Sequence, residues 1–526
     1  MSELENLHNE ETNDTSYDHV LKYTGVFGGV QGLKMLVSVL RNKLTSVFLG
    51  EVGIGLINVF NRISEFLVSA SNLGVPLNAT QRSGELFEVG TNEEIVHFVK
   101  VVRTWVLWTA ILAAMLAVLL PFLLLLLSWL FLHVFSIPSL HKYFLFIWNH
   151  YAEVLLMIPV SASLLLAEGE CAILKGLRQV KKVAIIEGLV AILTLALTVP
   201  FYYYMGIKGV AIGLICSNLA SFITHGFFSF RLVSYKVSPF SRTIFREGLP
   251  MIKKGIPYVL AGLSTAVLGV IIPALIIIQP ENGTLDDYGL YCAGWTLMVG
   301  YAGVVFIALE ADYFPRLSSV NQDTARMNQT INQQVDVCLL ILTPMLILFL
   351  LFLPWVIQLQ FTDAFVVVTQ MSVCACFYTF FRALSLPVGY TTLAKGDSML
   401  FLMMEVASNI FFGVLIWILY SAHGLTGAGV ALSIGALFDI VINLLICSYR
   451  YKVKIIKKTW MIFLFQFVCL FVTFLFCITS NLEMKFFFGG MAFVVSLLFS
   501  VFQLTKRSDF LRKVFHHFTH SSGDCC

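Results

Sequence analysis

The sequence predicts an all-α integral membrane protein with about fourteen transmembrane helices, arranged as two six-helix lobes related by pseudo-two-fold symmetry plus a C-terminal helix pair. Its composition, its apolar stretches and an internal repeat support this prediction. The chain is 58% hydrophobic and only 12% charged, with a mean hydropathy of +0.84. A soluble domain is typically about 25% charged. This composition excludes an ordinary soluble protein.

The spans follow from the apolar stretches, because about 20 apolar residues in helical form cross the hydrocarbon core. The third predicted span is long enough to tilt or to extend beyond the bilayer. Residues 1–20 are polar and acidic and predict a disordered cytoplasmic tail, with no cleavable signal peptide. The predicted spans are 22–44, 52–77, 104–133, 149–172, 183–204, 207–230, 255–279, 287–311, 334–361, 363–392, 398–420, 424–449, 459–479 and 484–504.

The charges of the loops predict the orientation. The loops after spans 2, 4, 6, 8, 10 and 12, together with the C-terminal tail, hold 25 lysines and arginines. The loops after the odd-numbered spans hold only 5. Because cytoplasmic loops carry the excess of basic residues, both termini are predicted to be cytoplasmic.

An internal repeat predicts the two lobes. The stretch EGLVAILTLALTVPFYYYMGIKG (187–209) aligns without gaps on EVASNIFFGVLIWILYSAHGLTG (405–427), at an offset of 218 residues. Because six spans is an even number, both copies insert in the same direction, and their symmetry axis should follow the membrane normal with the substrate site between them. The predicted segments are the N-tail 1–20, N-lobe 21–236, cytoplasmic linker 237–254, C-lobe 255–452, helix pair 453–505 and cytoplasmic C-tail 506–526.

Three stretches resemble a known family. RNKLTSVFLGEVGIGLINVFNRISEFLVSASNLGV (41–75) is similar to the first hairpin of Wzx-type O-antigen and polysaccharide translocases. ALEADYFPRLSSVNQDTARMNQTINQQ (308–334) and RALSLPVGYTTLAKGDS (382–398) resemble the segment between spans 8 and 9 and the tenth-span exit of the same family. These translocases are members of the multidrug/oligosaccharidyl-lipid/polysaccharide (MOP) exporter superfamily.

The resemblance implies a function. It implies a flippase that moves an undecaprenyl-pyrophosphate-linked oligosaccharide, such as an O-antigen repeat unit of lipopolysaccharide, across the bacterial inner membrane. It also implies a central cationic cavity that opens alternately to the two sides. The expected partners are that lipid-linked glycan, the bilayer and other polysaccharide-assembly proteins, with no nucleic acid. No cofactor or metal is expected, and coupling to H⁺ or Na⁺ is open.

When basic residues near the span ends are counted with the loops, only Lys34, Arg62 and Arg382 remain inside the predicted spans. Each costs roughly 2.5–3.5 kcal/mol to insert at mid-span. Arg62 and Glu65 are three residues apart and share a helix face. They form either a structural ion pair or a site in which Glu65 orients Arg62 toward a cavity. A pyrophosphate suits an arginine fork, which is a physical reason to accept the insertion cost.

The other basic candidates also have two interpretations. Lys34 either lines the cavity or packs inside its lobe. Arg41 and Lys43, near the outer end of span 1, are exit-side ligands of the pyrophosphate or interfacial anchors. Arg382 is the second-lobe counterpart of Arg62 or part of a structural pair, and Pro387 in the same span predicts a kink.

The acidic candidates have gating and coupling roles. Glu310 and Asp312, with Arg316, predict a latch at the inner gate or an interfacial cap. Asp336 and Asp439 are candidates for H⁺ or Na⁺ coupling. Glu187 and its repeat partner Glu405 are predicted to brace helix ends, and His225 to be a satisfied core histidine rather than a proton relay.

Other functions stay open beside the flippase. No enzyme motif occurs in the sequence, so the chain is predicted to be a transporter. The alternatives within transport are a lipid II flippase and a cation-coupled multidrug exporter, which should have a carboxylate-centred cavity. A membrane glycan polymerase or ligase would need a large external catalytic loop, and the longest predicted external loop is short.

Overall fold

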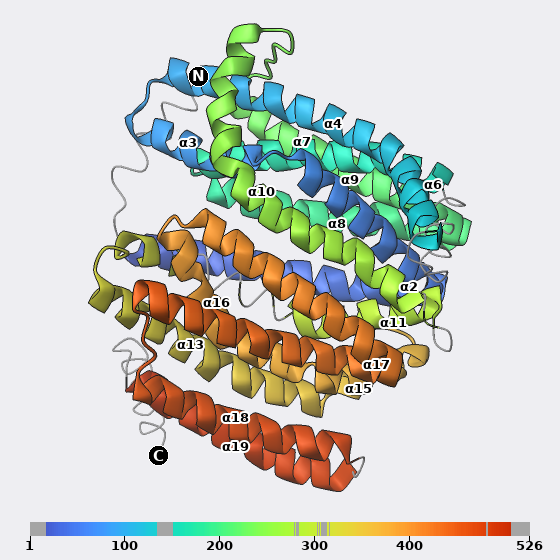
Figure 1. The fold of residues 1–526 in the computed structure, drawn as a ribbon, viewed down its shortest axis with the longest axis vertical. Coiled ribbons are helices and arrows are strands. Elements are labelled where there is room, and N and C mark those ends of the chain that lie inside the picture. Colours follow the sequence, from blue (N-terminus) through green and yellow to red (C-terminus); the bar gives the residue numbers. More distant parts are fainter. Residues whose placement is uncertain are drawn as a thin grey trace, which may run out of the picture. The chain divides into compact units, whose positions relative to one another are not determined.

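The computed structural model describes residues 17–133, 151–277, 283–301, 316–479 and 482–506, together with the single positions 279, 303, 306, 313 and 314. Within these residues the chain is helical and no β-strand occurs (Figure 1). The predicted all-α class is therefore confirmed. Glu310 and Asp312 lie outside the described residues.

The chain divides into two compact units, and the first comprises Met1–Cys292 with Gln360–Thr362. In it, α7 packs against α3, α4 and α9, and α2 packs against α8 and α10. Its elements are α2 (Tyr17–Ser71), α3 (Val75–Val89), α4 (Asn92–His133), α6 (Tyr151–Leu155), α7 (Met157–Gly176), α8 (Val180–Met205), η1 (Gly206–Lys208), α9 (Gly209–Leu232), α10 (Arg242–Ile277) and most of α11 (Leu285–Trp295).

The second unit comprises Ala293–Leu359 with Asp363–Cys526. In it, α16 packs along α17, and α13 packs against both α18 and α19. Its elements are η2 (Thr296–Gly300), α13 (Thr324–Leu351), α14 (Leu353–Gln360), η3 (Asp363–Val367), α15 (Val368–Cys374), α16 (Cys376–Ala394), α17 (Ser398–Tyr451), α18 (Lys457–Ile478) and α19 (Leu482–Thr505).

The last two helices are joined by a buried polar contact. Gln466 of α18 donates to Ser500 Oγ over 2.8 Å and accepts from Ser496 Oγ over 2.6 Å. An amide in an apolar helix is costly unless its polar atoms are paired, and both of its polar atoms have partners on α19. This explains how the C-terminal pair is held together.

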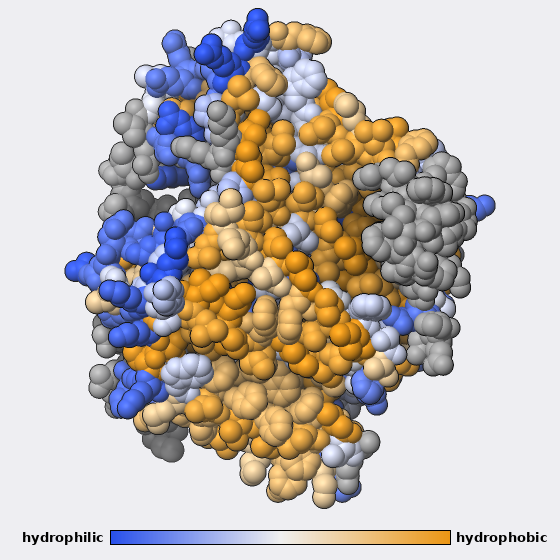
Figure 2. All heavy atoms as spheres, in the orientation of Figure 1, coloured by the Kyte–Doolittle hydropathy of each residue, from blue (hydrophilic) through white to orange (hydrophobic). Residues whose placement is uncertain are grey.

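The helices have the length and hydropathy of membrane spans. Among the described residues, nine helices pass this test, or up to ten if the bent pair Asp363–Cys374 and Cys376–Ala394 counts as one span. On the visible face, apolar side chains cover the middle of the helices and hydrophilic ones gather near their ends (Figure 2). The chain is a multi-pass membrane protein. Two of the apolar segments, Lys181–Leu232 and Ser398–Tyr451, each contain two of the predicted spans, and Gly32–Ser71 covers parts of two.

The repeated stretch forms the same hairpin twice. Gly206 has φ 57° and ψ −136°, and Gly424 has φ 55° and ψ −136°. A Cβ atom at Gly209 would collide with the carbonyl oxygen of Phe201, and one at Gly427 would collide with that of Leu419.

The residues of each colliding pair are eight positions apart, and in a straight helix such residues are separated by about 12 Å. Their close approach shows that the chain reverses at Gly206 and at Gly424. The positive φ favours glycine at the reversal, since other residues rarely adopt it. The hairpin thus recurs at the predicted offset of 218 residues.

The compact units divide the chain within α11, whereas the predicted lobes follow the repeat. Helix α10 packs against α2, α3 and α4 and is therefore part of the first unit. The predicted lobe boundaries stay a prediction.

Candidate functional site

The three basic side chains expected inside the membrane have a common setting. Each lies beside a carboxylate of its own unit, and each remains about one-third exposed. The pairs are Lys34 with Glu187 at 2.9 Å, Arg62 with Glu65 at 2.8 Å and Arg382 with Asp439 at 3.7 Å, and the basic side chains are 34%, 32% and 33% exposed.

Lys34 connects two helices. Its Nζ on α2 donates to Glu187 Oε2 on α8, and the two residues are 153 positions apart. The other carboxylate oxygen, Oε1, lies 4.0 Å from His225 Nε2 on α9. Glu187 therefore joins three helices, a role that its place at the end of a predicted span did not indicate.

Arg62 packs between helices of the first unit. Its Nη1 lies 2.8 Å from Glu65 Oε2 on the same helix, as their spacing predicts. On α10, a Cβ at Gly269 would lie 3.1 Å from Arg62 Cδ, so the bare glycine makes room for the arginine stem. Tyr288 and Cys292 of α11 interact with it electrostatically. Arg62 is thus both paired and accessible, and both interpretations of the pair remain open.

Arg382 of α16 faces more negative charge than the other two. Asp439 of α17 is its ion-pair partner and also hydrogen-bonds Ser408. Glu405, the repeat partner of Glu187, interacts electrostatically with both Arg382 and Asp439. Arg382 therefore lies near two carboxylates, one of which is its ion-pair partner, and the three side chains carry a net negative charge when all are ionised.

The residues expected at the outer end of the first span have different partners. Lys43 Nζ donates to the carbonyl oxygen of Phe361 over 2.7 Å, which ties α2 to a segment of the same unit. Arg41 interacts electrostatically with Tyr202 of α8. Both are part of the first unit's packing in addition to any role with a ligand.

Arg316 and Asp336 line one cavity of about 740 Å³ in the second unit. Arg316 Nη2 donates to Gln334 Oε1 over 3.3 Å. The predicted latch that joins Arg316 to Glu310 and Asp312 involves residues outside the described part. The rest of the cavity wall is rich in amides and comprises Ala325, Asn328, Gln329, Asn332, Gln333, Val337, Leu340, Ile456, Lys458 and Leu504.

The first unit also contains a buried ion pair that was not predicted from the sequence. Arg103 of α4 and Glu170 of α7 meet through two hydrogen bonds of 2.9 and 3.0 Å, with the side chains 2% and 5% exposed. Arg103 lies in the candidate span Asn92–Phe122, outside the third span as predicted from the sequence.

The predicted boundary of the third span explains why Arg103 was not among the candidate residues. The third span was predicted to begin at residue 104, but α4 begins at Asn92 and Arg103 lies inside an apolar helical segment. Glu170, an acidic residue inside the fourth predicted span, was the available signal that a buried cation must lie nearby. The remaining donors of Arg103 bind Ser229 Oγ and the carbonyl oxygens of Val233 and Ser234.

The comparisons with known proteins rest on structure. No protein-family model matches the chain, and no curated protein sequence does. The structure resembles the lipid II flippase MurJ in an inward closed conformation, with a TM-score of 0.64 and 14% identity over 91% of this chain and 99% of that one.

Two other similar structures are also transporters. One is an inward-facing multidrug resistance MATE family transporter, with a TM-score of 0.58 and 13% identity over 81% of this chain and 98% of that one. Another is a MOP superfamily transporter from Pyrococcus furiosus described as having a binding pocket of reverse polarity, with a TM-score of 0.51 and 15% identity over 81% and 94%.

These similarities define the fold of the chain. The chain has the fold of the MOP-superfamily transporters, in which lipid II flippases and multidrug transporters share one architecture. At such low identity the likeness extends to the fold alone. The choice of substrate has to come from the site.

Proposed function

We propose that this chain is a flippase that moves an undecaprenyl-pyrophosphate-linked oligosaccharide, such as the repeat unit of an O-antigen or another surface polysaccharide, across the bacterial inner membrane by alternating access. Both termini are cytoplasmic in this proposal. The fold shared with a lipid II flippase supports a lipid-linked substrate. The motifs at 41–75 and 308–334 support the polysaccharide branch.

The observation that carries the proposal is the pairing of Lys34 and Arg62 with carboxylates at partly exposed positions. A phosphate oxygen accepts the same charge-assisted hydrogen bonds as a carboxylate oxygen. A pyrophosphate can therefore replace Glu187 or Glu65 without leaving the cation unpaired. The carboxylates keep the basic side chains neutralised when no substrate is bound, which offsets the cost of charge in the membrane.

The charged residues of the second unit support a role in coupling transport to an ion. Because Arg382 is outnumbered by Asp439 and Glu405, this group has room for a further positive charge. We propose that H⁺ or Na⁺ binds here and supplies the coupling. Arg41 and Lys43 are proposed to bind the pyrophosphate at the exit side. Arg316 is proposed to act at the inner gate, and Asp336 in ion coupling.

Two alternatives within transport have support of their own. A lipid II flippase would present the same pyrophosphate chemistry to Lys34 and Arg62, and MurJ has this fold. A multidrug exporter would use the carboxylates as its binding groups, and the MATE transporters also have this fold. The similar structures named above do not include a membrane glycan polymerase or ligase.

A binding experiment separates these functions. The purified full chain would be mixed in detergent with undecaprenyl-pyrophosphate oligosaccharide, lipid II or a lipophilic organic cation, and retained ligand would be counted by native mass spectrometry. The proposal expects preferential retention of the oligosaccharide lipid. Preference for lipid II would move the chain to the peptidoglycan branch, and retention of the cation alone would identify an exporter.

A further inference from the structure

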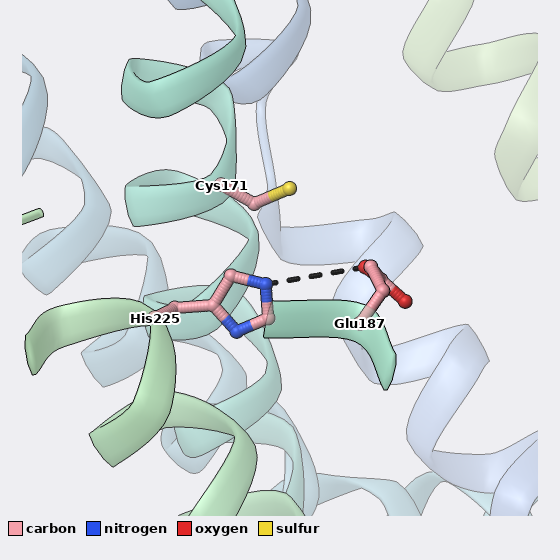
Figure 3. Close-up of side chains that lie close together, drawn as sticks. All are labelled: Cys171, Glu187 and His225. Atoms are coloured by element: carbon pink, nitrogen blue, oxygen red, sulfur yellow. Dashed lines mark ion pairs between the residues drawn. The ribbon is translucent and has the colours of Figure 1, made fainter. Parts of the chain in front are cut away.

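Three potential metal ligands from three helices meet inside the first unit. Cys171 comes from α7, Glu187 from α8 and His225 from α9, and their side chains point toward one another (Figure 3). The sulfur, one carboxylate oxygen and one ring nitrogen all lie within 4.8 Å of one another. Cys171 and His225 are only 8% and 4% exposed.

His225 is oriented as a metal-binding histidine is. Its Nδ1 lies 2.9 Å from the carbonyl oxygen of Ser221, so Nδ1 carries the hydrogen and the neutral ring presents a lone pair at Nε2. Among the described residues, this buried Nε2 has no hydrogen-bond partner. It faces Glu187 Oε1 at 4.0 Å. Metal-binding histidines almost always donate their other ring N–H to an oxygen in this way.

The other two side chains are held in a similar manner. Lys34 binds Oε2 of Glu187, which leaves Oε1 facing the histidine. Lys175, one helical turn beyond Cys171, hydrogen-bonds its sulfur. Each of the three side chains therefore has a neighbour that fixes its position.

We propose that Cys171, Glu187 and His225 bind a Zn²⁺ ion, with the fourth coordination position left to water. A mixed set of sulfur, nitrogen and oxygen ligands suits Zn²⁺ better than Mg²⁺ or Ca²⁺, which require oxygen ligands. Tetrahedral coordination would separate the ligand atoms by about 3.3–3.6 Å, given Zn²⁺ bond lengths of about 2.0–2.3 Å. Side-chain adjustments of less than about 1 Å bring the cluster to that geometry.

Two ligands of the proposed ion can carry negative charge, and the ammonium groups of Lys34 and Lys175 lie beside them. Binding of Zn²⁺ releases the thiol proton of Cys171 to solvent, and the thiolate and the Glu187 carboxylate together balance the metal. Lys34 then shares Glu187 with a dication and is freer to bind an anion. This last link to transport rests on the proposed function, whereas the metal site itself does not.

Metal binding by the full chain tests the proposal. The purified protein would be freed of metal with a chelator in detergent and titrated with Zn²⁺ by calorimetry and with Co²⁺ by absorption, since a thiolate bound to Co²⁺ gives a near-ultraviolet charge-transfer band. We expect one equivalent of Zn²⁺ and that band for the unaltered protein. Cys171→Ser should abolish the band, and His225→Gln should weaken Zn²⁺ binding by at least about tenfold.

The matched control is Cys216→Ser on α9, a cysteine of intermediate exposure outside the cluster. It should keep both the band and the stoichiometry. Size-exclusion profiles would verify that each variant is folded. Equal Zn²⁺ binding by the unaltered protein and a folded Cys171→Ser variant, or no stoichiometric binding at all, would overturn the site. The metal titrations contain no glycan, so a negative result for Zn²⁺ does not contradict the proposed flippase function. A negative result for glycan binding likewise does not contradict the Zn²⁺ site.

Discussion

Lys34 Nζ lies 2.9 Å from Glu187 Oε2, so an ion pair joins α2 and α8 across 153 positions of sequence. The lysine is about one-third exposed, and so is the glutamate. The pair therefore has both a structural partner and access to a ligand. An exchange of the two charges separates these roles.

The variant Lys34→Glu with Glu187→Lys keeps an ion pair between the two helices but moves the cation to α8. We expect near-normal protein abundance, because the charges remain matched, and loss of glycan export, because the ammonium has moved. Surface glycan would be measured by immunoblot in cells that lack their own flippase. Normal export by the swapped variant would assign the pair a purely structural role.

Arg62→Ala should abolish glycan export while leaving the amount of protein in the membrane nearly unchanged. Arg62→Lys should restore export only in part, because a lysine offers a point charge and no fork. Abundance and export would be measured in the same cells. Export that is unaffected by Arg62→Ala would contradict the proposed role in substrate binding.

Glu65→Gln is the companion variant for this pair. Both side chains are partly exposed, and an ion pair in contact with water contributes only about 0–1 kcal/mol. A modest fall in abundance is expected, and a severe one would show that Glu65 serves mainly to neutralise Arg62 for insertion.

Arg103→Ala, unlike Arg62→Ala, should lower the stability and the abundance of the protein. Removal of one partner from a fully buried ion pair typically costs about 3–5 kcal/mol, because the other charge stays buried. We expect a large fall in thermal stability in detergent and in abundance. The double variant Arg103→Leu with Glu170→Leu should recover part of the loss, since it leaves no buried charge. A stable Arg103→Ala single variant would contradict the structural role of this pair.

Acid should weaken the start of α17 through Asp397, which precedes the helix. Desolvation opposes the charged carboxylate, but hydrogen bonds from Tyr451 and Arg450, at 3.0 and 2.6 Å, hold the pKa of Asp397 below its usual value. A lowered folded-state pKa contributes stability above the unfolded value of about 3.9, and this stability is lost as pH falls through the folded pKa.

Thermal unfolding in detergent between about pH 3 and 6 would measure this contribution. Asp397→Asn should be less stable than the unaltered protein near pH 6, and the difference should shrink below about pH 4. A constant difference across this range would show that the carboxylate does not titrate as described.

Orientation is tested by reporter fusions. The excess of lysine and arginine in the loops after even-numbered spans predicts that a reporter fused after residue 280 is external and one fused after residue 455 is cytoplasmic. Alkaline phosphatase and green fluorescent protein activities would distinguish the two. The opposite pattern would invert every statement of sidedness in the proposal.

The sequence by itself determined the features that depend on near neighbours. Apolar composition over about 20 residues is enough to define a membrane helix. The Arg62–Glu65 pair follows from a spacing of three residues on one helix. The hairpins at Gly206 and Gly424 follow from a repeated local stretch with glycine where the backbone needs positive φ.

Only the tertiary structure decided which distant residues meet. The partner of Lys34, the burial of Arg103 against Glu170 and the gathering of Cys171 and His225 around Glu187 all depend on how helices far apart in sequence pack. Helical periodicity determines which side chains share a face, but the rotation and axial position of each helix against its neighbours are set by packing of the whole unit. The choice of partners is therefore a property of the packed unit and cannot be read from any single helix.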